Sequence, residues 1–106
     1  MIITGKRHDF VSHYEVCFDN DGRILGIEFE HMSRCGISAD LSGAINDRAM
    51  FHSDNAYFLE HSTIHSHRCK TNTVSNTAFR GFGGPQGMFA IEYVIDDIAR
   101  TLGKDP

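Results

Sequence analysis

Two short segments of alternating apolar and polar residues, separated by an Asp-Gly turn, constrain the fold of this chain more than any other feature. Residues 10–18 (FVSHYEVCF) alternate with the two-residue period of a half-buried strand, and residues 25–30 repeat that pattern. The residues between them end in Asp21-Gly22, and Asp-Gly between two alternating segments is the strongest short-range signal for a hairpin. The sequence therefore predicts an antiparallel hairpin whose apolar face consists of Phe10, Tyr14, Val16, Phe18, Leu25, Ile27 and Phe29.

A short helix is predicted after a turn-rich stretch at residues 33–38. Asp40 or Ser42 can cap it, because the oxygen of either side chain can accept the free amide hydrogens of a first helical turn. We expect the helix to continue to about Ser53, with a modest apolar stripe formed by Leu41, Ile45, Ala49 and either Phe51 or His52. Residues 57–59 and 64–70 are weaker strand candidates, and the polar residues 71–77 favour a loop.

The strongest helix signal lies near the carboxyl end of the chain. Pro85 suits a first helical position, where its missing N–H would have no partner in any case. Gly103 suits the left-handed residue that ends a helix. Apolar residues recur between these two positions at helical spacing, which predicts one buried stripe of Met88, Ile91, Ile95, Ile98 and Leu102.

These elements predict an α+β fold in the order β-β-α-β-α. With 106 residues, the chain has room for one domain, residues 1–106. We expect two layers, with a mostly antiparallel or mixed sheet and both helices on one of its faces. The other face would be open to a partner, and an unpaired edge strand could join two copies in a homodimer.

Charge and cysteine content exclude several classes of function. The net charge of −4 and the absence of a basic stripe argue against nucleic-acid binding. The apolar runs are far shorter than the ~20 residues that cross a bilayer, and the first seven residues lack the pattern of a secretory leader, so no membrane role is expected. An odd number of cysteines (Cys17, Cys35 and Cys69) without a CxxC pair favours a reducing compartment, most simply the cytoplasm.

A glycine-rich loop before the second helix is the best candidate for a site. Closely spaced glycines let a backbone approach a ligand, and the positive end of a helix favours an anion or an oxo group. The spacing of Gly81, Gly83 and Gly87 is one residue too long for a dinucleotide fingerprint, and the glycines could equally form only a tight turn. Arg80 and Phe82 favour a ligand, because they could hold its charge and stack against a planar ring.

Two further features have plain structural explanations. His61, His65, His67 and Cys69 include three side chains on one face of a strand that could converge on zinc, although their spacing matches no standard zinc site. Arg48 follows Asp47 on the first predicted helix, where a solvated helix face accounts for both residues.

Several blocks of the sequence, in order along the whole chain, resemble the molybdopterin-binding part of the xanthine dehydrogenase family of molybdenum hydroxylases. The blocks are Ile3 to His8, Asp40-Leu41-Ser42, Arg48-Ala49, His52, Asp54 to Tyr57, Lys70 to Thr73 and Ser75 to Gly87. The resemblance covers a small slice of the family's chain, so we expect these residues to be a piece of a larger molybdenum subunit.

The resemblance implies that the parent enzyme hydroxylates purines, converting hypoxanthine and xanthine to urate at a molybdenum–molybdopterin centre. Electrons would leave through 2Fe-2S clusters and FAD to NAD, on domains or subunits that are partners of this one. By analogy, Arg48 is the catalytic and substrate-binding residue that stabilises negative charge on the purine, and Phe82 packs on the purine ring. Family members that act on aldehydes tend to lack the arginine, so Arg48 favours a purine. The implied cofactor-binding residues are Phe79, Arg80, Gly81, Gly83, Gly84 and Gln86, with Arg80 beside the molybdenum but not a direct ligand.

The resemblance also implies that the site in this chain is partial. The catalytic carboxylate of the family, a second substrate-facing carboxylate, the other purine-stacking aromatic residue and most pterin-binding loops lie in segments absent here. The chain alone is therefore expected to be inactive. The alternative is a free-standing module that binds an anion at the glycine loop and a partner on its open sheet face.

Overall fold

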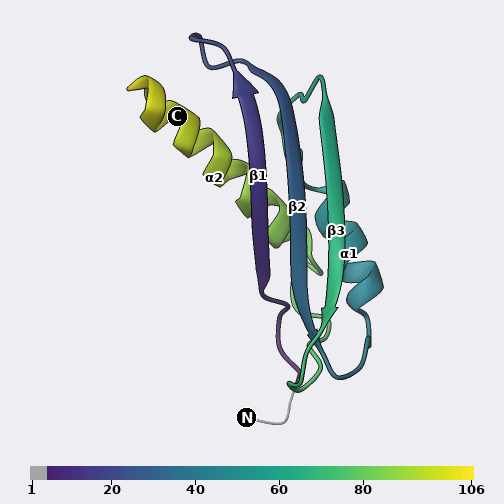
Figure 1. Ribbon diagram of the computed structural model, residues 1–106. Coiled ribbons are helices and arrows are strands. Elements are labelled where there is room, and N and C mark those ends of the chain that lie inside the picture. Colours follow the sequence, from purple (N-terminus) through teal and green to yellow (C-terminus); the bar gives the residue numbers. More distant parts are fainter. Residues whose placement is uncertain (1–4) are drawn as a thin grey trace.

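The computed structural model describes residues 5–106, and these form a three-stranded sheet with two helices (Figure 1). The elements follow in the order β1 (Phe10–Phe18), β2 (Ile24–Gly36), α1 (Ser42–Phe51), β3 (Ser62–Lys70) and α2 (Gly84–Leu102). This order confirms the predicted α+β fold. Two residues of the first block of the family resemblance, Ile3 and Thr4, lie outside the described residues, as does most of the region examined for a leader.

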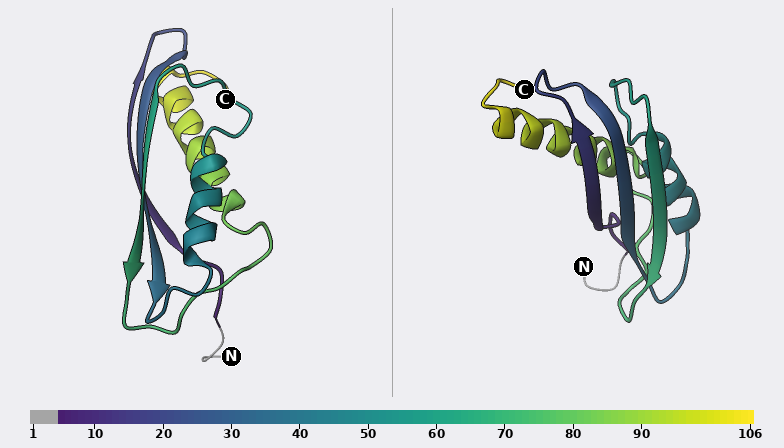
Figure 2. Two further views of the ribbon diagram at one scale, coloured as in Figure 1. Left: turned by 90° about the vertical axis from the view of Figure 1, so that its right-hand side faces the viewer. Right: turned by 45° about the horizontal axis from the view of Figure 1, so that its top comes forward.

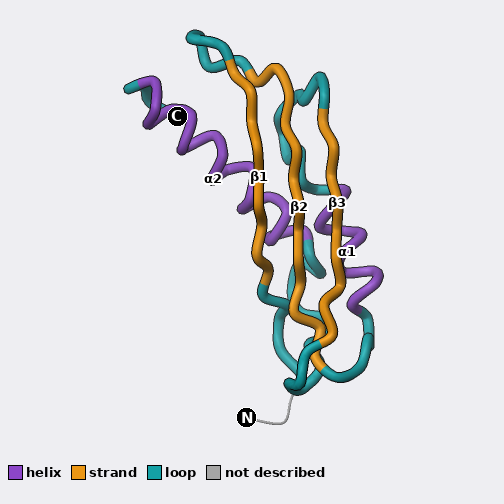
Figure 3. Tube along the Cα trace, viewed as in Figure 1, coloured by secondary structure: helices purple, strands orange, loops and turns teal. Residues whose placement is uncertain are grey.

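The sheet is mixed, with the strand order β1-β2-β3. β1 and β2 pair antiparallel through the predicted hairpin, whereas β2 and β3 pair parallel. A parallel pair needs a crossover connection, and α1 lies in that connection. Figure 2 shows both helices on one face of the sheet, as predicted, and Figure 3 shows that the remaining connections are loops.

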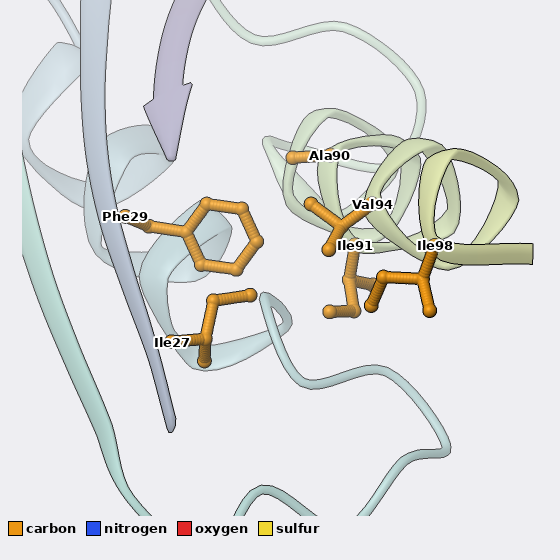
Figure 4. Packing of buried hydrophobic residues seen from close by; sticks show 6 residues of the cluster. All are labelled: Ile27, Phe29, Ala90, Ile91, Val94 and Ile98. Carbon is orange, nitrogen blue, oxygen red and sulfur yellow. The ribbon is translucent and has the colours of Figure 1, made fainter. Parts of the chain in front are cut away.

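The hydrophobic core lies between α2 and the middle of the sheet (Figure 4). Phe29 and Ile91 are fully buried there. The buried face of α2 consists of smaller residues than predicted. Three members of the predicted stripe, Met88, Ile95 and Leu102, are only half-buried. Small side chains let α2 approach its neighbours closely, and the cluster of buried residues is Ile27, Phe29, Ala90, Ile91, Val94 and Ile98.

The length of β2 and the residues of its buried face differ from the prediction. β2 continues through residues 33–36, where a turn was predicted, because these residues pair with the end of β3 and Ser33 donates a hydrogen bond to Asn46 Oδ1 at 2.7 Å. Leu25 is 46% exposed and leaves the apolar face that was predicted for it. The pairing shifts by one residue at this point, so Ile24, not Leu25, faces Phe18 and packs against the core.

The predicted cap and stripe of α1 are also partly wrong. The helix has no side-chain cap, since Asp40 accepts a hydrogen bond from Thr77 and the hydroxyl of Ser42 bonds to His8. Ile45 and Ala49 are buried as predicted, but Leu41 is 46% exposed, and neither alternative for the last position is buried, since Phe51 is 80% exposed and His52 is also exposed. The buried side of the helix therefore consists of Ser42, Ile45, Asn46 and Ala49, of which only Ile45 is a large apolar residue.

The connection after α1 contains no strand at residues 57–59, although one was predicted. Tyr57 donates hydrogen bonds to both carboxylate oxygens of Glu92, at 2.8 and 2.9 Å, and packs with Leu59 against the core. These side-chain contacts with α2 hold the segment without a neighbouring strand. The strand predicted at 64–70 and the loop predicted at 71–77 are confirmed, and β3 begins two residues earlier than expected.

A buried histidine lies beside the core. His31 is 1% exposed, stacks on Phe29 with 5.1 Å between ring centroids, and bonds through both ring nitrogens. Ser53 donates its hydroxyl hydrogen to Ala49 O, so it accepts from His31 Nε2 at 2.9 Å, while Ser12 lies 2.7 Å from Nδ1. These contacts place a proton on Nε2, so in the neutral ring Nδ1 accepts a hydrogen bond from Ser12. Burial lowers the pKa of His31 below its usual value of 6.5.

Candidate functional site

The glycine-rich loop between β3 and α2 forms a tight turn with an unusual backbone. Gly81, Phe82 and Gly83 have consecutive positive φ angles of 91°, 51° and 92°. The turn is closed by hydrogen bonds from Phe82 N to Phe79 O at 2.8 Å and from Gly84 N to Gly81 O at 3.0 Å. A positive φ costs a bulky residue roughly 1–3 kcal/mol and persists only where the surroundings impose it. The loop therefore fixes the direction in which Phe82 projects.

Two glycines of this region allow α2 to lie directly against α1. A Cβ atom at Gly83 would lie 2.1 Å from the carbonyl oxygen of Ile45, and one at Gly87 would lie 2.2 Å from that of Ala49. Both distances are too short for any side chain. Gly83 and Gly84, which were expected to bind a cofactor, are both buried at this contact. Their position supports the simple alternative for these glycines, a tight turn that packs the helix.

The contact between the helices brings together two of the predicted substrate-binding residues. The guanidinium carbon of Arg48, on α1, lies 5.6 Å from the centre of the Phe82 ring. That separation is within the range of a cation–π interaction. Arg48 is exposed and Phe82 is half-buried, and no ion pair within residues 5–106 involves Arg48. A cation and an aromatic ring thus stand together at the surface, with the charge unneutralised.

The other end of the loop rests on Arg7, a residue to which the sequence analysis gave no role. The guanidinium carbon of Arg7 lies 4.4 Å from the centre of the Phe79 ring. Its Nη1 atom is buried and has no hydrogen-bond partner within residues 5–106. Apart from its place in the block Ile3 to His8 that resembles the family, Arg7 had only one signal in the sequence, the charged run Lys6 to Asp9, and such a run usually marks a solvated segment.

Gln86 is directed away from the loop and toward the start of β1. Its Nε2 donates to the carbonyl oxygen of His8 at 3.1 Å, and its buried Oε1 has no partner within the described residues. His8 is 2% exposed, and its Nε2 lies 2.7 Å from Ser42 Oγ. Burial lowers the pKa of His8. Through these contacts, the segment before β1 that contains His8 is bonded both to Ser42 of α1 and to Gln86 of α2.

The electrostatics of this region differ from those of the whole chain. Arg80 is exposed and takes part in no hydrogen bond or ion pair within residues 5–106. Arg7 and Arg48 stack on the two phenylalanines that flank it in the loop. The glycine loop therefore carries unpaired positive charge on a chain whose net charge is −4. Such a surface suits a ligand that combines planar rings with an anionic group.

The histidines and cysteine of β3 lie elsewhere. His65, His67 and Cys69 share the outer face of the sheet, where all three are exposed and His67 Nε2 lies 3.2 Å from Glu30 Oε1. No group of three or more His, Cys, Asp or Glu side chains within residues 5–106 is arranged to hold a metal ion. His61 precedes the strand and adds no fourth ligand. Within the same residues, no helix is long and apolar enough to cross a membrane.

Comparison with solved structures identifies the class of fold. The fold matches the aldehyde oxidoreductase from Desulfovibrio gigas with a TM-score of 0.88 and 29% identity, covering 96% of this chain and 11% of that one. It also matches the quinoline 2-oxidoreductase from Pseudomonas putida with a TM-score of 0.77 and 26% identity, covering 94% of this chain and 13% of that one.

Sequence then gives the family. Residues 1–106 match the molybdopterin cofactor-binding domain, and the chain belongs to that family. It is 51% identical over 99% of its length to the xanthine dehydrogenase of Calliphora vicina, and 52% identical over its whole length to xanthine dehydrogenase 1 of Arabidopsis thaliana. It spans 8% of the length of each of these two relatives.

Part of the loop fits the cofactor that this family binds. Molybdopterin joins a planar pterin to a phosphate and to the sulfur atoms that hold molybdenum. Arg80 is exposed and has no ion-pair partner within residues 5–106, so it offers a cation for the anionic groups of this cofactor. Gly81 is needed for the turn itself, because a Cβ there would lie 2.5 Å from the Pro85 ring. Phe79 is 55% exposed and offers an apolar surface next to them. The residues present therefore fit one side of such a group.

Proposed function

We propose that this chain is the part of a xanthine dehydrogenase that positions a purine beside the molybdenum centre. The parent enzyme would convert hypoxanthine and xanthine to urate, and the 106 residues alone would be inactive. The observation that carries the proposal is the contact between Arg48 and Phe82, whose guanidinium carbon and ring centre are 5.6 Å apart although the residues belong to different elements. An aromatic ring can stack on a planar ring, and a cation beside it can stabilise negative charge that develops on that ring.

The two residues would have separate tasks. Phe82 would stack on the purine, and its fixed positive φ would hold the stacking plane without reorganisation when the substrate binds. Arg48 would donate hydrogen bonds to the purine where negative charge develops during the reaction. A donor that is oriented before the reaction contributes most to the rate, and loss of one such donor typically costs about 2.7–4 kcal/mol.

The cofactor would be held next to them by the exposed part of the loop. Arg80 would bind its anionic groups, while Phe79 and Gly81 would contact its planar rings. When bound, molybdenum–molybdopterin supplies the two-electron oxidation and the oxygen-atom chemistry that no side chain provides. Gly83 and Gly84 would act through the shape of the loop, because both are buried and Gly83 packs directly against Ile45 of α1. Gln86 would act through its bond to His8.

The remaining parts of the parent enzyme would be the partners of this domain. They are the rest of the molybdenum subunit, with the catalytic carboxylate and the other pterin-binding loops, and the domains or subunits that carry 2Fe-2S clusters, FAD and NAD. The coverage of only 8% of two long relatives supports this arrangement. Cys17, Cys35 and Cys69 are all free thiols, which supports a cytoplasmic location. An isolated chain could also pair through its open sheet edges as a homodimer.

The test is a pair of arginine variants in the full-length parent enzyme. Arg48→Ala should lower the kcat for xanthine about 10²- to 10³-fold while molybdenum content stays near normal. Arg80→Ala should instead lower molybdenum content or alter the reactivity of the centre. Arg23→Ala is the matched control, because Arg23 is an exposed arginine of the β1–β2 hairpin whose one ion-pair partner within residues 5–106 is Glu60.

The two variants separate the proposed roles. An unchanged rate in Arg48→Ala would exclude its role toward the purine, and normal metal content with normal kinetics in Arg80→Ala would exclude its role toward the cofactor. The alternative of a free-standing anion- or partner-binding module requires that the reading frame stop at both ends of these 106 residues. A frame that continues on either side would exclude that alternative.

A further inference from the structure

β1 forms one edge of the sheet, and half of its main-chain groups face away from β2. The strand order is β1-β2-β3, so within residues 5–106 β1 pairs on one side only (Figure 1). The direction of each residue follows from the hydrogen bond that Arg34 N donates to Asp9 O at 3.1 Å, at the start of the β1–β2 ladder. Because hydrogen-bonded and non-hydrogen-bonded pairs alternate along an antiparallel ladder, every second residue from Asp9 faces β2. These inward-facing residues of β1 are Val11, His13, Glu15 and Cys17, and the outward-facing residues are Phe10, Ser12, Tyr14 and Val16.

A hydrogen bond on the other side of β2 supports the same assignment. Ile27 lies opposite Val16, and its N–H donates to His61 O, just before β3, at 3.0 Å. Ile27 therefore directs its main-chain groups away from β1, and Val16 directs its own away from β2. The outward-facing residues thus offer N–H donors and C=O acceptors along the whole edge. A row of this kind is complementary to one class of partner, an extended chain that adds a strand.

β1 has few of the features that protect a strand edge from pairing. Natural edges are typically short or carry lysine, proline or a bulge. β1 is nine residues long and contains no Lys, Arg or Pro, and the register shift in its pairing with β2 lies between its last two residues, Cys17 and Phe18. The strand at the other edge of the sheet, β3, ends in Arg68-Cys69-Lys70. β1 is therefore the edge that is better suited to a further strand.

Side chains on both faces of β1 are also incompletely covered. Tyr14, Val16 and Phe18 pack against the core but are only half-buried. On the opposite face, Val11 is 58% exposed. Side chains directly opposite each other on paired strands lie about 4.5–5.5 Å apart, so a strand paired with β1 would cover side chains on both faces. The remaining exposure of this apolar surface favours a strand with apolar residues at alternate positions.

We propose that the outward-facing main chain of β1 pairs with a strand of the same polypeptide from outside residues 1–106. That strand extends the sheet beyond β1 and places apolar side chains beside Tyr14 and Val16. This inference rests on the proposed function, because that function makes the chain part of a much longer polypeptide. The chain spans 8% of the length of two relatives, so most of such a polypeptide lies outside these residues. A covalently joined strand has an effective concentration in the millimolar range, well above that of a second copy.

Hydrogen exchange in the full-length parent enzyme tests the pairing at single amides. The inward-facing amides of β1 are the internal control, because β2 protects them whether or not another strand is present. An amide in a paired strand exchanges only when the pairing opens, whereas an unpaired edge amide exchanges without that step. We expect the outward-facing amides to exchange within about tenfold of the inward-facing amides. Outward-facing amides that exchange faster than this would overturn the proposal.

Photo-crosslinking in the same enzyme identifies the strand. The photoreactive residue p-benzoylphenylalanine replaces Val11, and in a matched control it replaces Phe51, which is 80% exposed at the end of α1. After irradiation and digestion, mass spectrometry identifies the linked peptides. We expect position 11 to link predominantly to one segment of the same polypeptide outside residues 1–106, and position 51 not to link to that segment. The proposal would be overturned by no links above the control, by links confined to residues 1–106, or by links between two polypeptides.

Failure of the strand and failure of the proposed function give different results. Molybdenum content and xanthine turnover are measured on the same sample. Protected outward-facing amides and the expected links, without turnover, would support the strand and count against the proposed function alone. Turnover with unprotected outward-facing amides would count against the strand alone.

Discussion

A single methyl group at Gly87 tests how closely the two helices approach each other. Two effects of Gly87→Ala oppose one another. Alanine favours a helix interior over glycine by about 1 kcal/mol. Against this, the new Cβ would lie 2.2 Å from the carbonyl oxygen of Ala49, where contact needs more than 3 Å. The obstacle is backbone, which no side-chain rotation can clear, so α2 must move away from α1 by about 1 Å.

The cost of that movement exceeds the gain in helix propensity. Forcing extra atoms into a packed interface costs typically 1–3 kcal/mol, and here the shift also loosens the contact that holds Arg48 near Phe82. We expect a net loss of about 1–2 kcal/mol in the free energy of unfolding. For a domain of about 100 residues, each kcal/mol corresponds to roughly 4–8 °C in Tm.

Gly84→Ala is the matched control on the same helix. A Cβ at Gly84 would lie 3.5 Å from the end of the Met88 side chain, which is an ordinary contact, and its φ is not positive. This variant should be neutral, or more stable by up to about 1 kcal/mol, through the lower entropy of its unfolded chain. Thermal unfolding of the two variants side by side measures the difference. Equal Tm values would refute the close helix contact.

Two further predictions concern titrating groups. Burial lowers the pKa of His31 below 6.5, so the unfolded chain binds more protons than the folded chain as the pH falls below that value. The free energy of unfolding, measured by urea titration, should therefore decrease from pH 7 to pH 5, and it should decrease less steeply in His31→Gln. An equal pH dependence in the two proteins would contradict this assignment. The hydrogen bond to Asp97 raises the pKa of Tyr14 to about 12, so in Asp97→Asn the phenol should ionise closer to pH 10 by ultraviolet titration, and an unshifted titration would exclude that bond.

The fold could be predicted where local signals agreed with each other. The hairpin, the second helix and its end at Gly103 follow from alternation, helical spacing and turn chemistry, and all are present. The extension of β2 to Gly36 could not be predicted, because pairing with β3 holds a stretch that is rich in turn-forming residues. Asp40 failed as a cap because its carboxylate accepts a bond from Thr77, a residue 37 positions away.

The site was predictable only in part, for a similar reason. Composition and spacing pointed to the glycine loop, but they gave Arg48 no special role, since exposed arginines are common on helices. Its partner, Phe82, lies 34 positions along the chain and meets it only because glycines let α2 pack on α1. Arg7 had only weak signals, a charged run and a place in one block of the family resemblance, because its contact with Phe79 depends on the tertiary fold. Both residues act through contacts between distant parts of the chain.

The most direct test of the account measures metal content and turnover on the purified 106-residue chain. Elemental mass spectrometry counts molybdenum and zinc, and xanthine-dependent dye reduction measures activity on the same sample. A partial site predicts neither bound metal nor turnover in this chain, whereas the full-length parent should show both molybdenum and turnover. Stoichiometric molybdenum with turnover in the 106 residues would contradict the claim that the site is partial, and zinc without turnover would contradict the claim that the histidine strand binds no metal.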